Sequence, residues 1–148
     1  MFDLSKVEIA PSKLSGGVYW HIYRELDGTL GGRVVTGPTE DGCLLIVPMG
    51  LAYERKLEEA RKPYLQAIRA GRLTDQEGRD MIAEALAGTV LAGWWGIKAH
   101  GAEVPFSVEK AKELLADERW LALREFVLRA AQHRGSLLAN EEEEARGN

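Results

Sequence analysis

The segment Val18-Tyr19-Trp20-His21-Ile22-Tyr23 contains only β-branched and aromatic residues apart from one histidine. Residues of these types are enriched in β-strands, so the segment predicts a strand. Asp27-Gly28 then supplies a turn signal, and Leu30 to Thr36 is expected to return as the second strand of a hairpin. Gly31-Gly32 lies inside this second strand and is expected to weaken it or to form a bulge.

The next two segments mark the change from strands to helices. The continuous apolar run from Cys43 to Val47 predicts a buried strand, which Pro48 ends. From Leu51 onward the apolar residues follow a helical period. Because proline lacks an amide donor and clashes with the preceding turn, we expect Pro63 to kink or break this helix.

A second helix is predicted to begin near Asp75. Thr74 and Glu77 have the spacing of a capping box, in which each side chain binds the other residue's amide. Four apolar residues then recur at every fourth position: Ile82, Leu86, Val90 and Trp94. This stripe predicts that the helix continues as far as Trp94.

Two further helices are predicted in the last third of the chain, the first beginning at Val108 after a Ser107 cap and the last carrying an apolar face. Together the elements predict an α+β fold: a small N-terminal antiparallel sheet at about 18–47, followed by a bundle of three to four helices at about 51–140. We expect one domain over residues 1–140. Residues 141–148 begin with four glutamates and are expected to form an acidic disordered tail.

Composition and charge exclude several classes of protein. The chain has 148 residues, of which 45% are apolar, which suits one folded domain. The net charge is -4, and the acidic tail accounts for three of these charges, so no basic surface is expected that would bind nucleic acid. The longest apolar stretch, 85–97, is too short to cross a bilayer, and the N-terminus lacks the pattern of a signal peptide. We expect a cytoplasmic protein without a membrane segment.

The residue types that usually carry catalysis are sparse. His21, His100 and His133 do not have a metal-binding spacing, so we expect no metal, no cofactor and no catalytic residue. The single cysteine, Cys43, excludes an internal disulfide and is expected to be a core residue. A small hydrolase that uses Cys43 or His100 is the least favoured alternative.

The adjacent tryptophans in Gly93-Trp94-Trp95-Gly96-Ile97 are the most unusual feature. Neighbouring side chains on a helix point about 100° apart, so one core face can hardly bury both rings. If Trp94 continues the apolar stripe, Trp95 lies at its margin. Trp95 then either packs beneath the loop that contains Phe106 or contacts another protein.

The second half resembles the tail assembly chaperones of long-tailed (siphovirus-type) bacteriophages and prophages. The residues that carry the resemblance are Trp94-Trp95-Gly96-Ile97, Gly101, Val104-Pro105-Phe106-Ser107-Val108-Glu109-Lys110-Ala111 and Leu114-Leu115. Those proteins share the order of a helix ending in tryptophan and glycine, a polar loop, a Pro-Phe-Ser helix entry and a final helix. The resemblance covers about residues 79–148.

The resemblance implies a non-enzymatic protein that binds the tape-measure protein and recruits the major tail protein during tail assembly. The resemblance also implies that the protein is located in the host cytoplasm and is absent from the mature virion. It does not decide whether the protein forms homo-oligomers. The partner-binding residues expected on this basis are Trp94, Trp95, Ile97, Phe106, Trp120, Leu123 and Phe126. The alternative from another class is a structural virion protein of the tail or neck.

Overall fold

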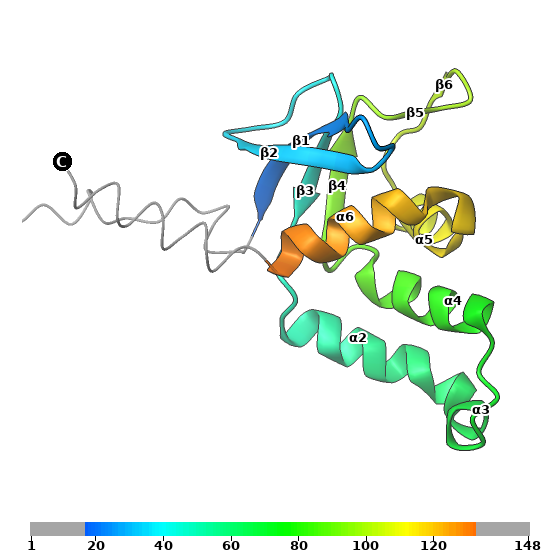
Figure 1. The fold of residues 1–148 in the computed structure, drawn as a ribbon. Coiled ribbons are helices and arrows are strands. Elements are labelled where there is room, and N and C mark those ends of the chain that lie inside the picture. The colour runs from blue at the N-terminus through cyan, green and yellow to red at the C-terminus, as the bar shows by residue number, and fades with distance from the viewer. Residues whose placement is uncertain (1–16, 133–148) are drawn as a thin grey trace, which may run out of the picture.

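The computed structural model describes residues 17–132, which contain an antiparallel sheet with helices on one face (Figure 1). The sheet has the order β2-β1-β3-β4. Its strands are β1 (Val18–Arg24), β2 (Leu30–Val35), β3 (Cys43–Ile46) and β4 (Leu91–Trp95). The predicted α+β class and its three N-terminal strands are confirmed, and a fourth strand joins them from the second half of the chain.

The hairpin formed by β1 and β2 is regular. Its register runs without a shift from Tyr19 opposite Val35 to Arg24 opposite Leu30, so the bulge expected at Gly31-Gly32 is not formed. Instead Gly32 makes room for a ring of the last helix, because a Cβ atom at this position would lie 2.5 Å from Cζ of Phe126. The glycine is therefore explained by packing rather than by strand geometry.

The prediction of one helix from Asp75 to Trp94 was wrong. Helix α4 (Asp75–Leu86) is followed by a turn in which Gly88 has a φ of 83°, a conformation that glycine adopts without strain. The chain then enters β4, where Leu44 pairs with Trp94 and Cys43 pairs with Trp95. Trp94 and Trp95 therefore point to opposite faces of a sheet, and Gly93 is a strand residue rather than a helix contact.

The other helix boundaries follow the predicted signals. Helix α2 (Leu51–Arg61) ends where Pro63 enters the short 3₁₀ helix η2 (Lys62–Tyr64), and the chain continues as α3 (Leu65–Arg69), so the predicted break is confirmed. The predicted capping box of α4 is also present: the Glu77 amide donates to Thr74 Oγ1 at 3.1 Å, and the Thr74 amide donates to Glu77 Oε1 at 3.0 Å.

The segment between β4 and the last helices contains more structure than the predicted loop. Strands β5 (Lys98–Ala99) and β6 (Ala102–Glu103) form a short hairpin that turns at His100-Gly101. Helix α5 (Val108–Ala116) begins at the predicted cap, since the Lys110 amide donates to Ser107 Oγ at 3.0 Å. The 3₁₀ helix η3 (Glu118–Trp120) then leads into α6 (Leu121–Gln132).

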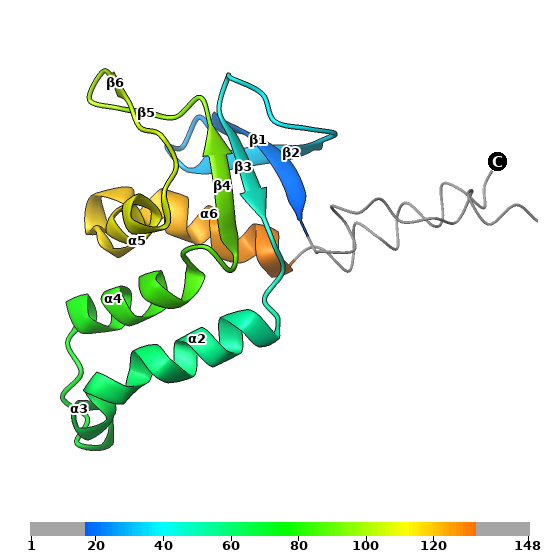
Figure 2. The same cartoon turned by 180° about the vertical axis from the view of Figure 1, so that it is seen from behind.

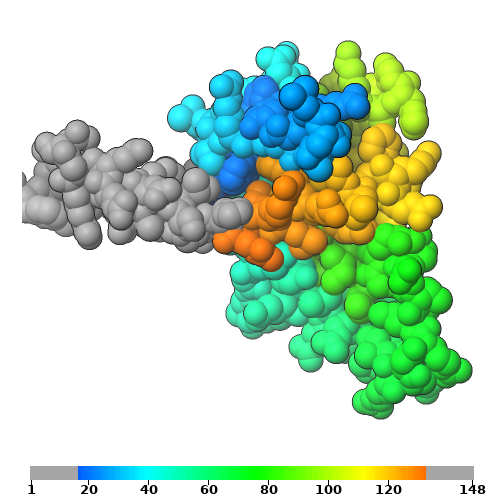
Figure 3. Space-filling view, in the orientation of Figure 1, coloured from blue at the N-terminus to red at the C-terminus, as the bar shows by residue number. Residues whose placement is uncertain are grey.

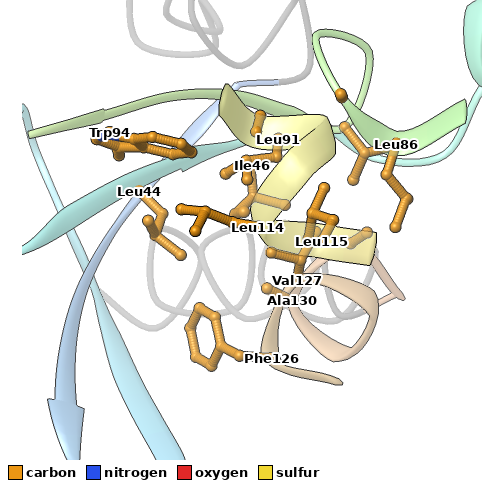
Figure 4. Close-up of a cluster of buried hydrophobic side chains, with 14 of the residues drawn as sticks. Leu44, Ile46, Leu86, Leu91, Trp94, Leu114, Leu115, Phe126, Val127 and Ala130 are labelled. Atoms are coloured by element: carbon orange, nitrogen blue, oxygen red, sulfur yellow. The ribbon is translucent and has the colours of Figure 1, made fainter. Parts of the chain in front are cut away.

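The core lies between the sheet and helices α5 and α6. Figure 1 shows α6 crossing in front of the strands, and Figure 2 shows the same strands from behind with no helix covering them. In the close-up, the strand residues Leu44 and Trp94 lie beside Leu114 of α5, and Phe126 of α6 belongs to the same buried cluster (Figure 4). Helix α4 adds Ala83 and Leu86 to this core, and it packs against α5 on one side and α2 on the other.

Among residues 17–132, the model contains no helix with the length and apolar character needed to cross a membrane.

Candidate protein-binding groove

The surface that best combines the predicted partner-binding residues is a mostly apolar groove of about 500 Å³. Three of the seven predicted residues line it, namely Ile97, Trp120 and Leu123. Further apolar walls come from Ile22, Leu30, Ala99, Leu114 and Ala122. We call the hollow that these eight residues line the apolar groove. Its charged rim consists of Arg24, Asp41, Lys98 and Arg119.

Three separate parts of the chain build the apolar groove. Strands β1 and β2 supply one wall, the segment from Gly96 to Ala99 supplies a second, and the segment from Leu114 of α5 through η3 to the start of α6 supplies the third. In the space-filling view, the blue β1–β2 turn, the yellow-green β5–β6 hairpin and the first residues of α6 come together at the upper right (Figure 3). The Arg129 guanidinium donates to the Leu30 carbonyl at 2.9 Å, which fastens β2 to α6.

The rim of the apolar groove carries more positive than negative charge. Arg24, Lys98 and Arg119 line it together with one carboxylate, Asp41. Arg119 is already bound to Asp117, which accepts its guanidinium at 2.7 Å and its backbone amide at 2.9 Å. Within the described part of the chain, Arg24 and Lys98 form no ion pair.

Asp117 orders the entry to α6, which holds Trp120 in place. The hydrogen bonds from the Arg119 side chain and backbone hold the pKa of the Asp117 carboxyl below its ordinary value. A depressed pKa in the folded state means that the charged form stabilises the protein above the unfolded pKa of about 3.9, and that this contribution is lost as the pH falls through the lower folded value.

We therefore expect acid to remove part of the stability that depends on Asp117. The melting temperature of the wild-type protein should exceed that of Asp117→Asn by a constant margin between pH 7 and pH 5. Below about pH 4 the margin should narrow, because Asp117 becomes neutral and asparagine can still cap the Arg119 amide. Thermal unfolding followed by circular dichroism measures both curves. A margin that does not change down to pH 3 would contradict the assigned role of the charge.

The two adjacent tryptophans and Phe106 line a second hollow, of about 620 Å³, on the other side of the β5–β6 hairpin. Trp94 is only 4% exposed. Its Nε1 donates to the Val104 carbonyl at 2.6 Å, and its ring meets Phe106 edge to face at 4.9 Å between centroids. Trp95 lies on the opposite face of β4 and contacts Tyr19, with ring centroids 5.6 Å apart. Trp94 therefore packs beneath the loop that contains Phe106 and holds it in place. The prediction from the sequence gives this position as one of two alternatives for Trp95.

The last predicted residue, Phe126, lies in the core. It is 5% exposed, its ring meets Trp20 edge to face at 5.7 Å, and it covers Gly32. Of the seven predicted residues, three therefore line the apolar groove, three line the second hollow, and Phe126 lies in the core.

The residues considered for hydrolysis do not share a cleft. Cys43 is fully buried in β3, and its thiol lies 3.9 Å from the Leu44 carbonyl. None of the hollows described here includes Cys43 among its lining residues. His100 lies on the β5–β6 turn, with its ring centroid 6.0 Å from that of Trp120. The third histidine, His133, lies outside the described residues, as does the acidic tail.

His21 is the register partner of Cys43, and its Nδ1 is buried without a hydrogen-bond partner among the described residues. No group of three or more potential metal-binding side chains is found in residues 17–132.

Sequence reasoning missed the residues that strands β1 and β2 contribute to the apolar groove. Ile22 and Leu30 belong to the predicted hairpin, and Arg24 directly follows its first predicted strand, but no local signal indicates that the turn lies against the start of α6. Lys98 falls in the segment between Gly96 and Phe106, which is predicted to be a loop. These residues are brought together only by tertiary packing.

A family model described as "YdaY prophage protein" matches residues 49–148. Neither the search of curated proteins nor the search of solved structures gave a match. The family match includes α6 and the β5–β6 hairpin, which form two walls of the apolar groove, and it leaves out β1 and β2.

Proposed function

This chain belongs to the YdaY prophage protein family and is therefore a phage-related protein, and on this premise we propose that it acts in tail assembly by binding another phage protein without catalysis. The partner we propose is an apolar segment of the tape-measure protein, which the chain keeps soluble until the major tail protein is recruited.

The apolar groove is the observation that carries this proposal. Its walls offer aliphatic and aromatic side chains, and its charges lie at the rim. An apolar surface with a charged rim is the arrangement that protein-binding sites use, because burial of the apolar part supplies affinity and the rim supplies specificity. Trp120 supports the assignment further, since tryptophan is enriched among residues that dominate binding energy.

The resemblance to tail assembly chaperones supplies the identity of the partner. One part of that resemblance is corrected, because Trp94 and Trp95 belong to a strand and not to the end of a helix. The Pro105-Phe106-Ser107 entry into α5 and the final helix remain in the expected order. The proposal of a tape-measure partner therefore depends on these later elements and on the phage-related family.

The direct experiment is co-expression with the tape-measure protein encoded by the same prophage. We expect a complex that survives purification and a larger soluble fraction of the tape-measure protein. A tape-measure protein that remains insoluble and does not co-purify would contradict the proposal. The same lysates can show whether the major tail protein joins the complex, which tests the recruitment step.

Replacing Trp120 with alanine should weaken this complex about 30-fold, the effect of removing a residue worth about 2 kcal/mol of binding energy. The matched control is Leu121→Ala, since Leu121 is the next residue, is 43% exposed and lines none of the hollows described here. Titration calorimetry gives both dissociation constants, and thermal unfolding confirms that both variants fold. Equal affinities for the two variants would place the binding surface elsewhere.

A structural virion protein is the other outcome that must be distinguished. Mass spectrometry of purified particles separates the two functions, because an assembly chaperone should be nearly absent from them. Recovery of this chain in an amount comparable to other tail proteins would favour the structural function.

A further inference from the structure

The rim of the apolar groove indicates what kind of segment fits it. Arg24 and Lys98 stand beside apolar walls without an ion pair among the described residues, while Arg119 is paired with Asp117. Asp41 is the carboxylate that lines the groove with them, and Glu103 stands opposite Lys98 in the β5–β6 hairpin without an ion pair to it. A complementary occupant therefore has apolar side chains followed closely by carboxylates.

The chain itself contains such a sequence. Leu137-Leu138 is followed, after two residues, by the run from Glu141 to Glu144. These residues lie outside the described part of the structure. The run supplies four carboxylates and the leucine pair supplies the apolar side chains that the rim and walls require.

The chain length is sufficient for this segment to reach the groove. Leu123 and Gln132 are nine residues apart on α6, which corresponds to about 14 Å at the rise of an α-helix. Leu137 follows Gln132 by five residues, which can span up to about 17 Å when extended. Leu137 and Leu138 can thus return as far as Leu123, and the glutamates beyond them can reach the charged rim.

We propose that Leu137 to Glu144 binds in the apolar groove of its own chain, with the leucines against Leu123 and Trp120 and the glutamates beside Arg24 and Lys98. The segment then competes with any partner for the same surface. Occupancy of the groove is independent of the proposed function. Regulation of tape-measure binding by this segment rests on that function.

Zero-length cross-linking with a carbodiimide tests the occupancy in the full-length protein, because it joins a lysine amine to a carboxylate only when the two are in contact. We expect Lys98 to be joined to Glu141–Glu144 more often than Lys62, which is exposed at the end of α2 farther from the sheet. Equal yields at the two lysines would overturn the proposal. A mixture of isotope-labelled and unlabelled protein must give bonds within one chain, and bonds mainly between chains would also overturn it.

The double variant Leu137→Ser with Leu138→Ser separates docking of the leucines from attraction between charges alone. It should lose most of the Lys98 cross-link, and a cross-link that persists unchanged would contradict docking in the groove. The same variant should bind the tape-measure protein several-fold more tightly than wild type, because the competing segment no longer fills the groove. Unchanged affinity would overturn the regulatory role. If neither protein binds the tape-measure protein, and the Lys98 cross-link is present in wild type and lost in the variant, only the proposed function is contradicted.

Discussion

Replacement of Gly96 with alanine is expected to lower the free energy of unfolding by about 3 kcal/mol or more. Gly96 has a φ of 65°, which costs alanine about 1–2 kcal/mol. The added Cβ would also overlap the carbonyl group of Glu40 and lie 2.9 Å from the amide nitrogen of Gly42. Because both contacts are with backbone in the connection between β2 and β3, no side-chain rotation relieves them.

Gly101→Ala is the matched control for this experiment. Gly101 has a similar φ of 80°, but a Cβ at this position would meet no atom within 4 Å. Only the conformational cost of about 1–2 kcal/mol should remain. Urea denaturation followed by circular dichroism gives both values. Equal losses of stability would show that the contact between Gly96 and Glu40 does not restrain the fold.

Signals that act over a few residues predicted the local structure correctly. The side chains of Thr74 and Ser107 accept hydrogen bonds from the backbone amides that the sequence spacing indicates. Helix α2 ends just before Pro63, which cannot continue an α-helix without losing a hydrogen bond. The hairpin formed by β1 and β2 follows from its residue types and the turn between them. Each of these outcomes depends on backbone chemistry within about four residues, which the sequence displays directly.

The error at β4 arose because two patterns coincide. Leu86, Val90 and Trp94 fit a helical spacing, but the segment between Gly88 and Gly96 also has the length and bounding glycines of a buried strand. The sheet decides between them, since β3 needs a neighbour on its outer edge and β4 supplies it. The residue types within this segment could not show that it pairs with β3, which lies about 50 residues earlier in the chain.

The apolar groove was only partly predictable for a similar reason. Trp120 and Leu123 are three residues apart where η3 leads into α6, so a common surface follows from their spacing. Their proximity to Ile22 and Leu30 depends on how the β1–β2 hairpin packs on α6, where Gly32 accommodates the Phe126 ring and Arg129 binds the Leu30 carbonyl. No pattern within either segment indicates this contact across about 100 residues.

Trp94→Ala is expected to lower the free energy of unfolding by about 3–5 kcal/mol, the usual cost of removing a buried aromatic side chain. The variant loses the edge-to-face contact with Phe106 and leaves the Val104 carbonyl without the indole donor. Because Trp94 also lies in the core cluster beside Leu44 and Leu114, the cavity would open next to α5 as well as beneath the loop.

Trp95→Ala serves as the control because the two residues are adjacent but face opposite sides of the sheet. Trp95 is only partly buried and packs on Tyr19 and on the backbone of Gly93, so its loss should cost about 1–2 kcal/mol. Urea denaturation of both variants measures the difference. The large asymmetry is specific to a strand with one face against the helices, whereas losses of equal size would be incompatible with the placement of Trp94 and Trp95 on β4.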